Sequence, residues 1–230
     1  MSVIPVITID GPSGSGKGTI AQILAKKLGW HFLDSGVLYR VIGWAVLNAK
    51  IDPVDHAAIK NLINNISIEM QVPEIGDEAA IFCNNHDVTD EIRGEACGQM
   101  ASITSAIPLV RAALLDRQRE MRQSPGLVTD GRDMGTVVFP DAMLKFYVTA
   151  SLDERANRRY NQLKNKGKHV SLADVHRELS VRDERDMNRT IAPAKPADDV
   201  ISIDTTHMTI ESVMQLVLQH VQSVMGKRGF

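Results

Sequence analysis

A nine-residue glycine-rich segment near the start of the chain most constrains how the chain can fold. The segment, Gly11–Thr19, reads GPSGSGKGT and follows the apolar, β-branched run Val3–Ile9. Behind it, apolar residues recur at helical spacing until Gly29: Ile20, Ile23, Leu24 and Leu28. This pattern predicts a buried strand, a glycine-rich loop and an amphipathic helix in direct succession.

The loop has the features of an anion-binding site. Glycines let successive backbone N–H groups turn inward around an anion, and the N-terminus of the next helix directs more unpaired N–H groups to the same place. Lys17 can lie along the β- and γ-phosphates of a nucleoside triphosphate, as in a P-loop. We therefore expect the cofactor phosphates to be bound by Gly11, Pro12, Ser13, Gly14, Ser15, Gly16, Lys17, Gly18 and Thr19.

One position departs from the common P-loop pattern. The residue after the lysine is usually a Ser or Thr that ligates Mg²⁺, whereas here it is Gly18, with Thr19 next. The hydroxyl nearest the ion is then Thr19 or, through water, Ser15. We expect Mg²⁺ to be held mainly by nucleotide phosphates and water, without a set of protein metal ligands, since the seven histidines show no metal-ligand spacing.

Further along the chain, short apolar runs alternate with helical patterns. Strands are expected at His31–Leu33, Gly126–Thr129, Met143–Val148 and Val200–Ile203. Helices are expected near Gly36–Ala49, Val54–Asn64, Glu91–Ile103, Leu109–Met121, Leu152–Met187 and Ile210–Met225. Strands separated by helices predict an α/β, P-loop three-layer fold with a central parallel sheet. Residues 66–90 instead indicate short strands with a hairpin turn at Asn84-Asn85, a small β-rich insert.

Composition narrows the class of protein. The chain has 230 residues, 43% of them hydrophobic, and a net charge of −2, which fits one globular core with an insert or two and excludes a disordered chain. Only two cysteines occur, and no apolar run reaches the ~18–20 residues that cross a bilayer. The N-terminus lacks the pattern of a secretory signal, and near-neutral charge argues against general nucleic-acid binding. We expect a cytoplasmic monomer that acts on small molecules.

Three arginine-bearing motifs indicate a second phosphate site. They are Asp34-Ser35-Gly36-x-x-Tyr39-Arg40, Asp130-Gly131-Arg132-Asp133 and Arg182-Asp183-x-Arg185-Asp186-x-x-Arg189. The first two follow predicted strands, and ligands of open α/β sheets bind at the carboxyl ends of the strands. Arginine forks pair bidentately with phosphate oxygens and stabilise the charge of a phosphoryl transition state. The motifs therefore predict an acceptor that itself carries a phosphate.

Four segments in this order, GPSGSGKGT, LDSGVLYR, DGRDMGTVVFPDA and RDERDMNR, resemble the bacterial cytidylate kinase family of nucleoside monophosphate kinases. Together they extend over most of the chain. The resemblance implies an ATP-dependent (d)CMP kinase, which transfers the γ-phosphoryl of ATP to the 5′-phosphate of CMP or dCMP and gives CDP or dCDP and ADP. It also implies that the β-rich insert is the family's extended nucleotide-binding region.

The resemblance further implies roles for individual residues. The acceptor phosphate would be bound by Ser35, Arg40, Arg132 and Arg189, with Tyr39 beside them. Arg182 and Asp186 would hold the ribose hydroxyls, and Ser102, Arg111 and Asp133 would read the cytosine edge. That last set suits cytosine chemically, because O2 and N3 are acceptors and the exocyclic amine is a donor. The catalytic set would be Lys17, Arg132, Arg158 and Arg189.

Residues 151–169 are locally basic, with six Lys or Arg against two Asp or Glu. Arg155, Arg158 and Arg159 share a helix face. We interpret 151–189 as a lid over ATP with its tip at 164–169, which brings Arg155 or Arg159 to the transferring phosphoryl group; by analogy with related kinases, Arg158 contacts ATP. The alternative is a solvated charged face. The expected subdivision of the single unit 1–230 is a core (1–62, 104–150, 190–230), an acceptor-nucleotide insert (63–103) and this lid.

Simpler explanations exist for several of these residues. Asp34 can cap the helix after it, and Asp130 is either a Walker-B-type carboxylate or a loop cap. A salt-bridged helix face is the alternative for the arginines of 182–189, and the preferred one for Arg185. Two other functions compete, a kinase for another small molecule such as shikimate and a slow nucleotide switch. The switch is disfavoured because the sequence has no Asn-Lys-x-Asp motif.

Overall fold

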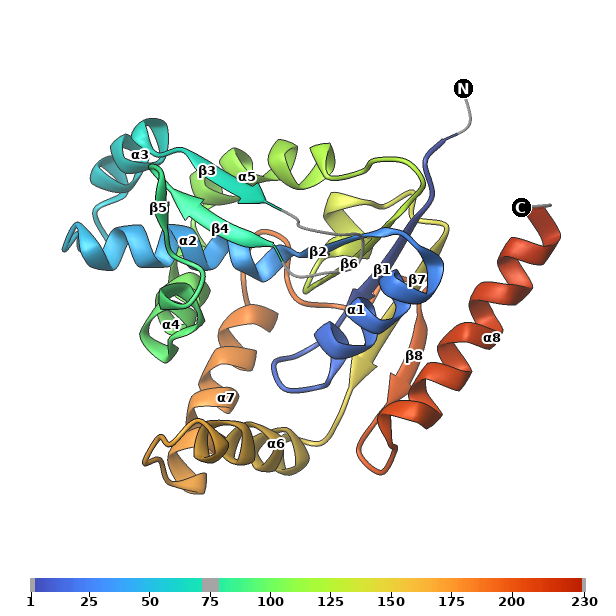
Figure 1. Ribbon diagram of the computed structural model, residues 1–230. Helices are drawn as coiled ribbons and strands as arrows, with labels where there is room; N and C mark the ends of the chain where they lie inside the picture. Colours follow the sequence, from blue (N-terminus) through green and yellow to red (C-terminus); the bar gives the residue numbers. More distant parts are fainter. Residues whose placement is uncertain (1–2, 72–78, 229–230) are drawn as a thin grey trace.

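A five-stranded parallel sheet forms the centre of the protein, as the computed structural model of residues 3–71 and 79–228 shows (Figure 1). The strand order is β2-β6-β1-β7-β8. The strands are β1 (Val6–Asp10), β2 (His31–Asp34), β6 (Leu127–Gly131), β7 (Leu144–Thr149) and β8 (Ile201–Asp204). Every neighbouring pair in this sheet is parallel, which confirms the predicted α/β class.

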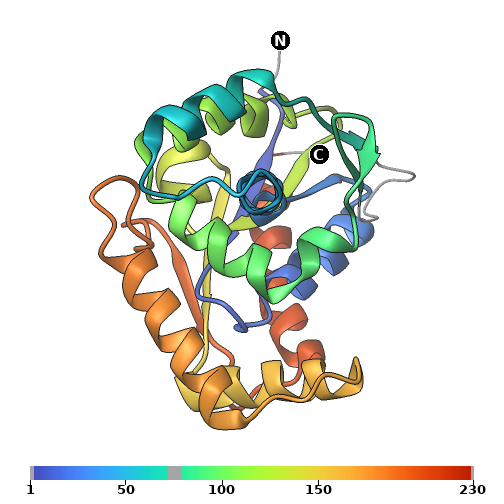
Figure 2. The ribbon, with the colours of Figure 1, turned by 90° about the vertical axis from the view of Figure 1, so that its left-hand side faces the viewer.

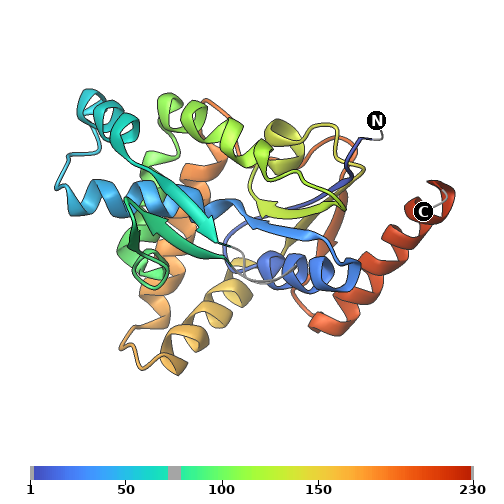
Figure 3. The same ribbon diagram turned by 45° about the horizontal axis from the view of Figure 1, so that its top comes forward.

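Helices cover both faces of the sheet, because successive side chains of each strand point to opposite sides. Ile7 and Ile9 of β1 pack in one cluster with α1 (Lys17–Leu28) and α8 (Ile210–Arg228). Val6 lies in another cluster with Leu115 of α5 (Pro108–Glu120) and with the π-helical turn Met134–Val138. The result is the predicted three-layer arrangement, with α8 on the side opposite the insert (Figures 1 and 3).

The insert contains a small antiparallel sheet of β3 (Ile68–Gln71), β4 (Ala80–Cys83) and β5 (His86–Asp87). Asn84 and Asn85 connect β4 to β5 with φ values of 49° and 62°. Positive φ at both turn residues is the requirement of a type I′ hairpin. The hairpin prediction is therefore confirmed. Residues 72–78, within the predicted insert, lie outside the described residues.

The insert packs on helices rather than standing alone. Its buried side chains Ile81 and Cys83 share a cluster with α2 (Ser35–Asn48), α3 (His56–Asn65) and α5. Two further helices, α6 (Leu152–Asn165) and α7 (Leu172–Met187), form an arm that extends from the sheet, and α7 lies beside α4 (Glu95–Thr104) (Figure 2).

Three element boundaries differ from expectation. The helical stretch expected over Leu152–Met187 is two helices, and the chain turns between them at Gly167, with φ 72°, within the expected lid tip 164–169. The helix expected over Glu91–Ile103 is broken at Gly94, whose extended backbone separates a 3₁₀ turn from α4. The first strand begins at Val6 rather than Val3, after Pro5, which has no N–H for the ladder.

Gly11 leaves β1 against the backbone of β7, and a side chain does not fit there. A Cβ at this position would lie 2.0 Å from the Val148 carbonyl oxygen, and the residue has φ 153°. We expect Gly11→Ala to lower the melting temperature by about 2–12 °C, since overpacking costs about 1–3 kcal/mol. Differential scanning calorimetry measures this. Gly226→Ala in α8 is the control, because its Cβ would meet no atom within 4 Å; equal melting temperatures for the two variants would contradict the expectation.

Candidate active site

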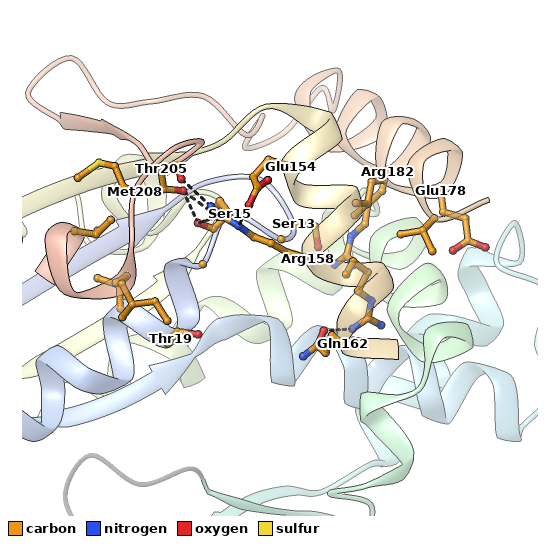
Figure 4. A pocket seen from close by; sticks show the side chains of 18 of the residues that line it. Ser13, Ser15, Thr19, Glu154, Arg158, Gln162, Glu178, Arg182, Thr205 and Met208 are labelled. Atoms are coloured by element: carbon orange, nitrogen blue, oxygen red, sulfur yellow. Dashed lines mark hydrogen bonds and ion pairs between the residues drawn. The ribbon is translucent and has the colours of Figure 1, made fainter. Parts of the chain in front are cut away.

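A cavity of about 610 Å³ lies between the P-loop, the α6–α7 arm and the start of α8. We call it the donor cavity. Its lining includes the predicted loop residues Ser13, Gly14, Ser15, Gly16 and Thr19, as well as Arg158. Arg158 lies across the loop in Figure 4, where it donates to Thr205 Oγ1 at 3.1 Å and to the Ser15 carbonyl at 3.4 Å. The volume of the donor cavity is in the range of small-molecule sites.

The loop has the predicted backbone geometry. Gly14 and Gly16 have φ values of 78° and 89°, which L side chains rarely adopt, and α1 begins directly after Gly16. Lys17 Nζ donates to the Pro12 carbonyl at 3.4 Å and lies 4.0 Å from Asp130 Oδ2. Gly11 and Pro12 line neither the donor cavity nor the acceptor cavity described below.

Lys17 and Asp130 are buried together at the end of the sheet. Burial and the neighbouring Arg132 together lower the pKa of Lys17 to about 8. Burial and the neighbouring Asp34 raise the pKa of Asp130 to about 8. Both charges are thus disfavoured in the ligand-free site, where an incoming phosphate would stabilise the ammonium of Lys17.

A second cavity, of about 240 Å³, adjoins the P-loop; we call it the acceptor cavity. All ten predicted substrate-binding residues line it: Ser35, Tyr39, Arg40, Ser102, Arg111, Arg132, Asp133, Arg182, Asp186 and Arg189. They come from α2, α4, α5 and α7 and from the segments that follow β6 and α7, so only the tertiary fold brings them together. Lys17 and Gly18 line this cavity as well. Ser13, Arg40 and Arg182 line both cavities.

The arginines that line the acceptor cavity differ in their partners. Arg132 Nε donates to Asp186 Oδ2 at 3.0 Å. Burial, followed by Arg132, lowers the pKa of Arg182 to about 10. The Nε of Arg182 is buried and has no hydrogen-bond partner among the described residues. Concentrated positive charge with unsatisfied donors is the electrostatic requirement of a phosphate site.

The predicted base-reading residues Arg111 and Asp133 form a pair in the lining of the acceptor cavity. Arg111 Nη2 donates to Asp133 Oδ2, and both side chains are buried. The Arg111 guanidinium also lies over the Tyr39 ring, 5.5 Å from its centroid. The pair therefore presents a fixed donor and a fixed acceptor, which is the chemistry that an amidine-like base edge requires.

The two lid arginines proposed for the phosphoryl group differ in their surroundings. Arg155 donates to the carbonyls of Ala150 and Ser13 and to Asp183, and it lines neither the donor nor the acceptor cavity. Through Ser13 and Asp183, Arg155 connects the P-loop to α7. Arg159 lines the donor cavity and donates to Glu95 Oε2 at 2.6 Å, which links α6 to α4. The charged face is therefore not simply solvated.

The structure also tests the simpler roles suggested for Asp34 and Arg185. Asp34 Oδ1 accepts the Gly36 N–H at 2.9 Å and so caps α2, and the residue lines the acceptor cavity as well. Arg185, for which a salt-bridged face is the preferred interpretation from sequence, instead donates through Nη1 to Ser102 Oγ at 3.0 Å. The sequence signal for this contact was that Arg185 lies three residues after Arg182 and so on the same helix face.

Asp10, at the end of β1, positions a loop of the site, and its role was not predicted from the sequence. Its carboxylate oxygens accept the Met134 and Gly135 N–H groups at 2.9 and 2.8 Å, which fixes the segment after Asp133. Its position one residue before the P-loop, after an apolar strand, gave a signal. Thr205 and Ser105 were also missed; each lies in a loop or helix end with no motif around it.

Burial raises the pKa of Asp10 from 3.8 to about 6. Because the folded pKa exceeds the unfolded one, the folded state binds more protons between these values, and stability falls as pH rises from about 4 to 6. We expect wild-type protein to lose up to about 3 kcal/mol relative to Asp10→Asn over this interval. Urea unfolding at pH 4.5, 5.5 and 7 measures the difference; parallel profiles for the two proteins would contradict it.

The fold and the two adjoining cavities define the class of protein: a P-loop phosphotransferase with places for two phosphate-bearing molecules. A family model described as cytidylate kinase matches residues 7–223. The cytidylate kinase of Coxiella burnetii (strain RSA 493 / Nine Mile phase I) is 53% identical over 218 residues, which cover 95% of this chain and 92% of that protein. The chain belongs to the cytidylate kinase family.

Other relatives agree. The cytidylate kinase of Stutzerimonas stutzeri (strain A1501) is 52% identical over 218 residues, covering 95% of both proteins. A solved structure of a protein from Eubacterium ventriosum, titled uncharacterized, has a TM-score of 0.50 at 13% identity and covers 96% of this chain and 99% of that chain; this likeness shows a shared fold. No helix of the described residues is long and apolar enough to cross a membrane.

Proposed function

We propose that this protein transfers the γ-phosphoryl group of ATP to the 5′-phosphate of CMP, and of dCMP, giving CDP or dCDP and ADP. The observation that carries the proposal is the acceptor cavity, where four arginines and Lys17 adjoin the buried Arg111–Asp133 pair. Positive charge suits a phosphate, and the buried pair suits a cytosine edge. Family membership supports both assignments.

The mechanism follows from the positions of the donor cavity, the acceptor cavity and Lys17. ATP in the donor cavity places its terminal phosphates against the loop amides and Lys17, and CMP in the acceptor cavity directs its phosphate toward the same lysine. The acceptor phosphate is already ionised at pH 7, so no strong general base is required. Catalysis then consists of positioning and charge stabilisation by Lys17, Arg132, Arg158 and Arg189, with Arg159 as a second lid arginine that lines the donor cavity.

The residues of this site suit a Mg²⁺ ion bound together with ATP. Asp130 Oδ1 is buried and lacks a hydrogen-bond partner among the described residues, and oxygen donors are the ligands that Mg²⁺ prefers. Thr19 lines the donor cavity with an exposed side chain, whereas Ser15 is buried. We assign Thr19 and Asp130 to the ion, acting through its water ligands. When bound, Mg²⁺ neutralises charge on the transferring phosphates.

The remaining assignments are part of the same proposal. Both cavities are lined by one chain, which supports an active monomer. The subdivision into core, insert (63–103) and lid (151–189) is supported by the separate sheet of the insert and by the α6–α7 arm. The free, buried cysteines Cys83 and Cys97 fit the reducing cytoplasm, where we place the protein.

A coupled ADP-release assay with Mg-ATP tests the function. CMP, dCMP, UMP, AMP, GMP and shikimate are supplied as alternative acceptors. Rapid ADP release with CMP and dCMP, and slow release with the others, supports the proposal. Equal release without any acceptor would favour a nucleotide switch, and release with shikimate alone would favour the other small-molecule kinase.

A further inference from the structure

Ser105, at the carboxyl end of α4, contacts two arginines that line the acceptor cavity, Arg189 and Arg111. Its hydroxyl accepts Arg189 Nη1 at 3.2 Å and donates to the Ser102 carbonyl at 3.0 Å. Its own carbonyl accepts Arg111 Nη1 at 3.4 Å. Ser105 is 5% exposed, so water contributes little to these contacts.

The contact with Ser105 decides which edge of Arg189 remains available. The Nε and Nη2 atoms of Arg189 are buried and have no hydrogen-bond partner among the described residues. These two N–H groups form the side-on edge of the guanidinium, which pairs with two oxygens of one phosphate. The end that Ser105 holds is Nη1, so the free edge is left for a ligand in the cavity that Arg189 lines.

We propose that Ser105 is a positioning residue for the acceptor phosphate. By accepting Nη1, it holds the Arg189 fork in the orientation that receives phosphate, and its bond to the Ser102 carbonyl fixes the Ser105 hydroxyl in turn. An arginine that is oriented before binding loses less side-chain freedom when the ligand arrives. This inference rests on the proposed function, because it assigns the phosphate of CMP to Arg189.

Ser105→Ala removes the acceptor and leaves the helix end intact. We expect the KM for CMP to rise about tenfold or more, because a hydrogen bond to a charged group is lost. The KM for ATP and the affinity for cytidine, which has no phosphate, are expected to stay unchanged. Calorimetric titration with CMP and with cytidine separates an effect on the phosphate from an effect on the base.

A double-mutant cycle tests whether Ser105 acts through Arg189. In an Arg189→Met background, Ser105→Ala is expected to change CMP affinity no further. Ser105→Thr keeps the hydroxyl and is expected to retain most of the affinity. Thr104→Val is the matched control, because the Thr104 hydroxyl bonds only to the Met100 and Ala101 carbonyls of its own helix.

Each other outcome overturns the inference. Equal losses for CMP and cytidine would mean that Ser105 acts on the base or on the fold, and the same loss with and without Arg189 would exclude the proposed route. An unchanged KM for CMP in Ser105→Ala would do so as well. Failure of the wild-type protein to phosphorylate CMP is a separate result, which would remove the proposed function itself.

Discussion

Replacing Lys17 with alanine is expected to lower kcat by at least ~10³ while leaving the protein folded. Lys17 Nζ is the one cation that projects from the P-loop itself, and it lies at the acceptor cavity, 4.0 Å from Asp130. In the proposed reaction it contacts the phosphoryl group during transfer, when negative charge is redistributed. Its loss therefore removes stabilisation that no nearby loop amide can replace.

The fold should tolerate this substitution because Lys17 is an unfavourable buried charge in the ligand-free protein. Burial lowers its pKa to about 8, so folding weakens rather than strengthens its protonation. Steady-state ADP release measures kcat, and circular dichroism measures the melting temperature. Lys27→Ala, on the exposed end of the same helix, is the control, with kcat expected unchanged. Turnover like wild type in Lys17→Ala would reject the role of Lys17.

Replacing Arg111 with methionine is expected to destabilise the protein by about 3–5 kcal/mol. The change leaves the Asp133 carboxylate buried without its cation, and breaking a buried ion pair from one side carries a penalty of this size. Burial already raises the pKa of Asp133, so the carboxylate depends on Arg111 to remain charged. Urea denaturation at pH 7 measures the loss. Arg177→Met, which removes an exposed pair with Asp174, is expected to cost less than about 1 kcal/mol.

The Arg111–Asp133 pair also allows a functional measurement that does not depend on the stability of the Arg111 variant. Asp133→Asn keeps the shape of the side chain but changes an acceptor oxygen into a donor. We expect the ratio of kcat/KM for CMP over UMP to fall by about tenfold or more, since a site with a mispaired polar group discriminates poorly. The KM for ATP should not change. An unaltered CMP preference would show that the base is read elsewhere.

Much of this architecture could be predicted because it depends on local sequence. The P-loop requires glycines at backbone positions such as Gly14 and Gly16, and the central strands are short runs that are buried at every position. Eight of the ten acceptor residues lie in the family motifs, and Ser102 and Arg111 came from the wider family resemblance. The structure gathers all ten around one cavity. What they bind is still a proposal.

The residues that sequence reasoning missed act through tertiary contacts. Ser105 matters only because α7 brings Arg189 to the end of α4, and Arg185 because the same helix brings it to Ser102. Arg155 shares a helix face with Arg158, yet its guanidinium donates to the Ser13 carbonyl of the P-loop and to Asp183. Helical spacing gives a residue's face, but not the element that packs against it.

A crystal structure with CMP bound tests the central claim most directly. The account predicts the phosphate within hydrogen-bond distance of Arg132 and Arg189, on the side of the cavity that Lys17 lines, and the cytosine edge against Arg111 and Asp133. CMP bound in the donor cavity, or with its phosphate in contact with Arg111 and its cytosine away from the Arg111–Asp133 pair, would contradict it.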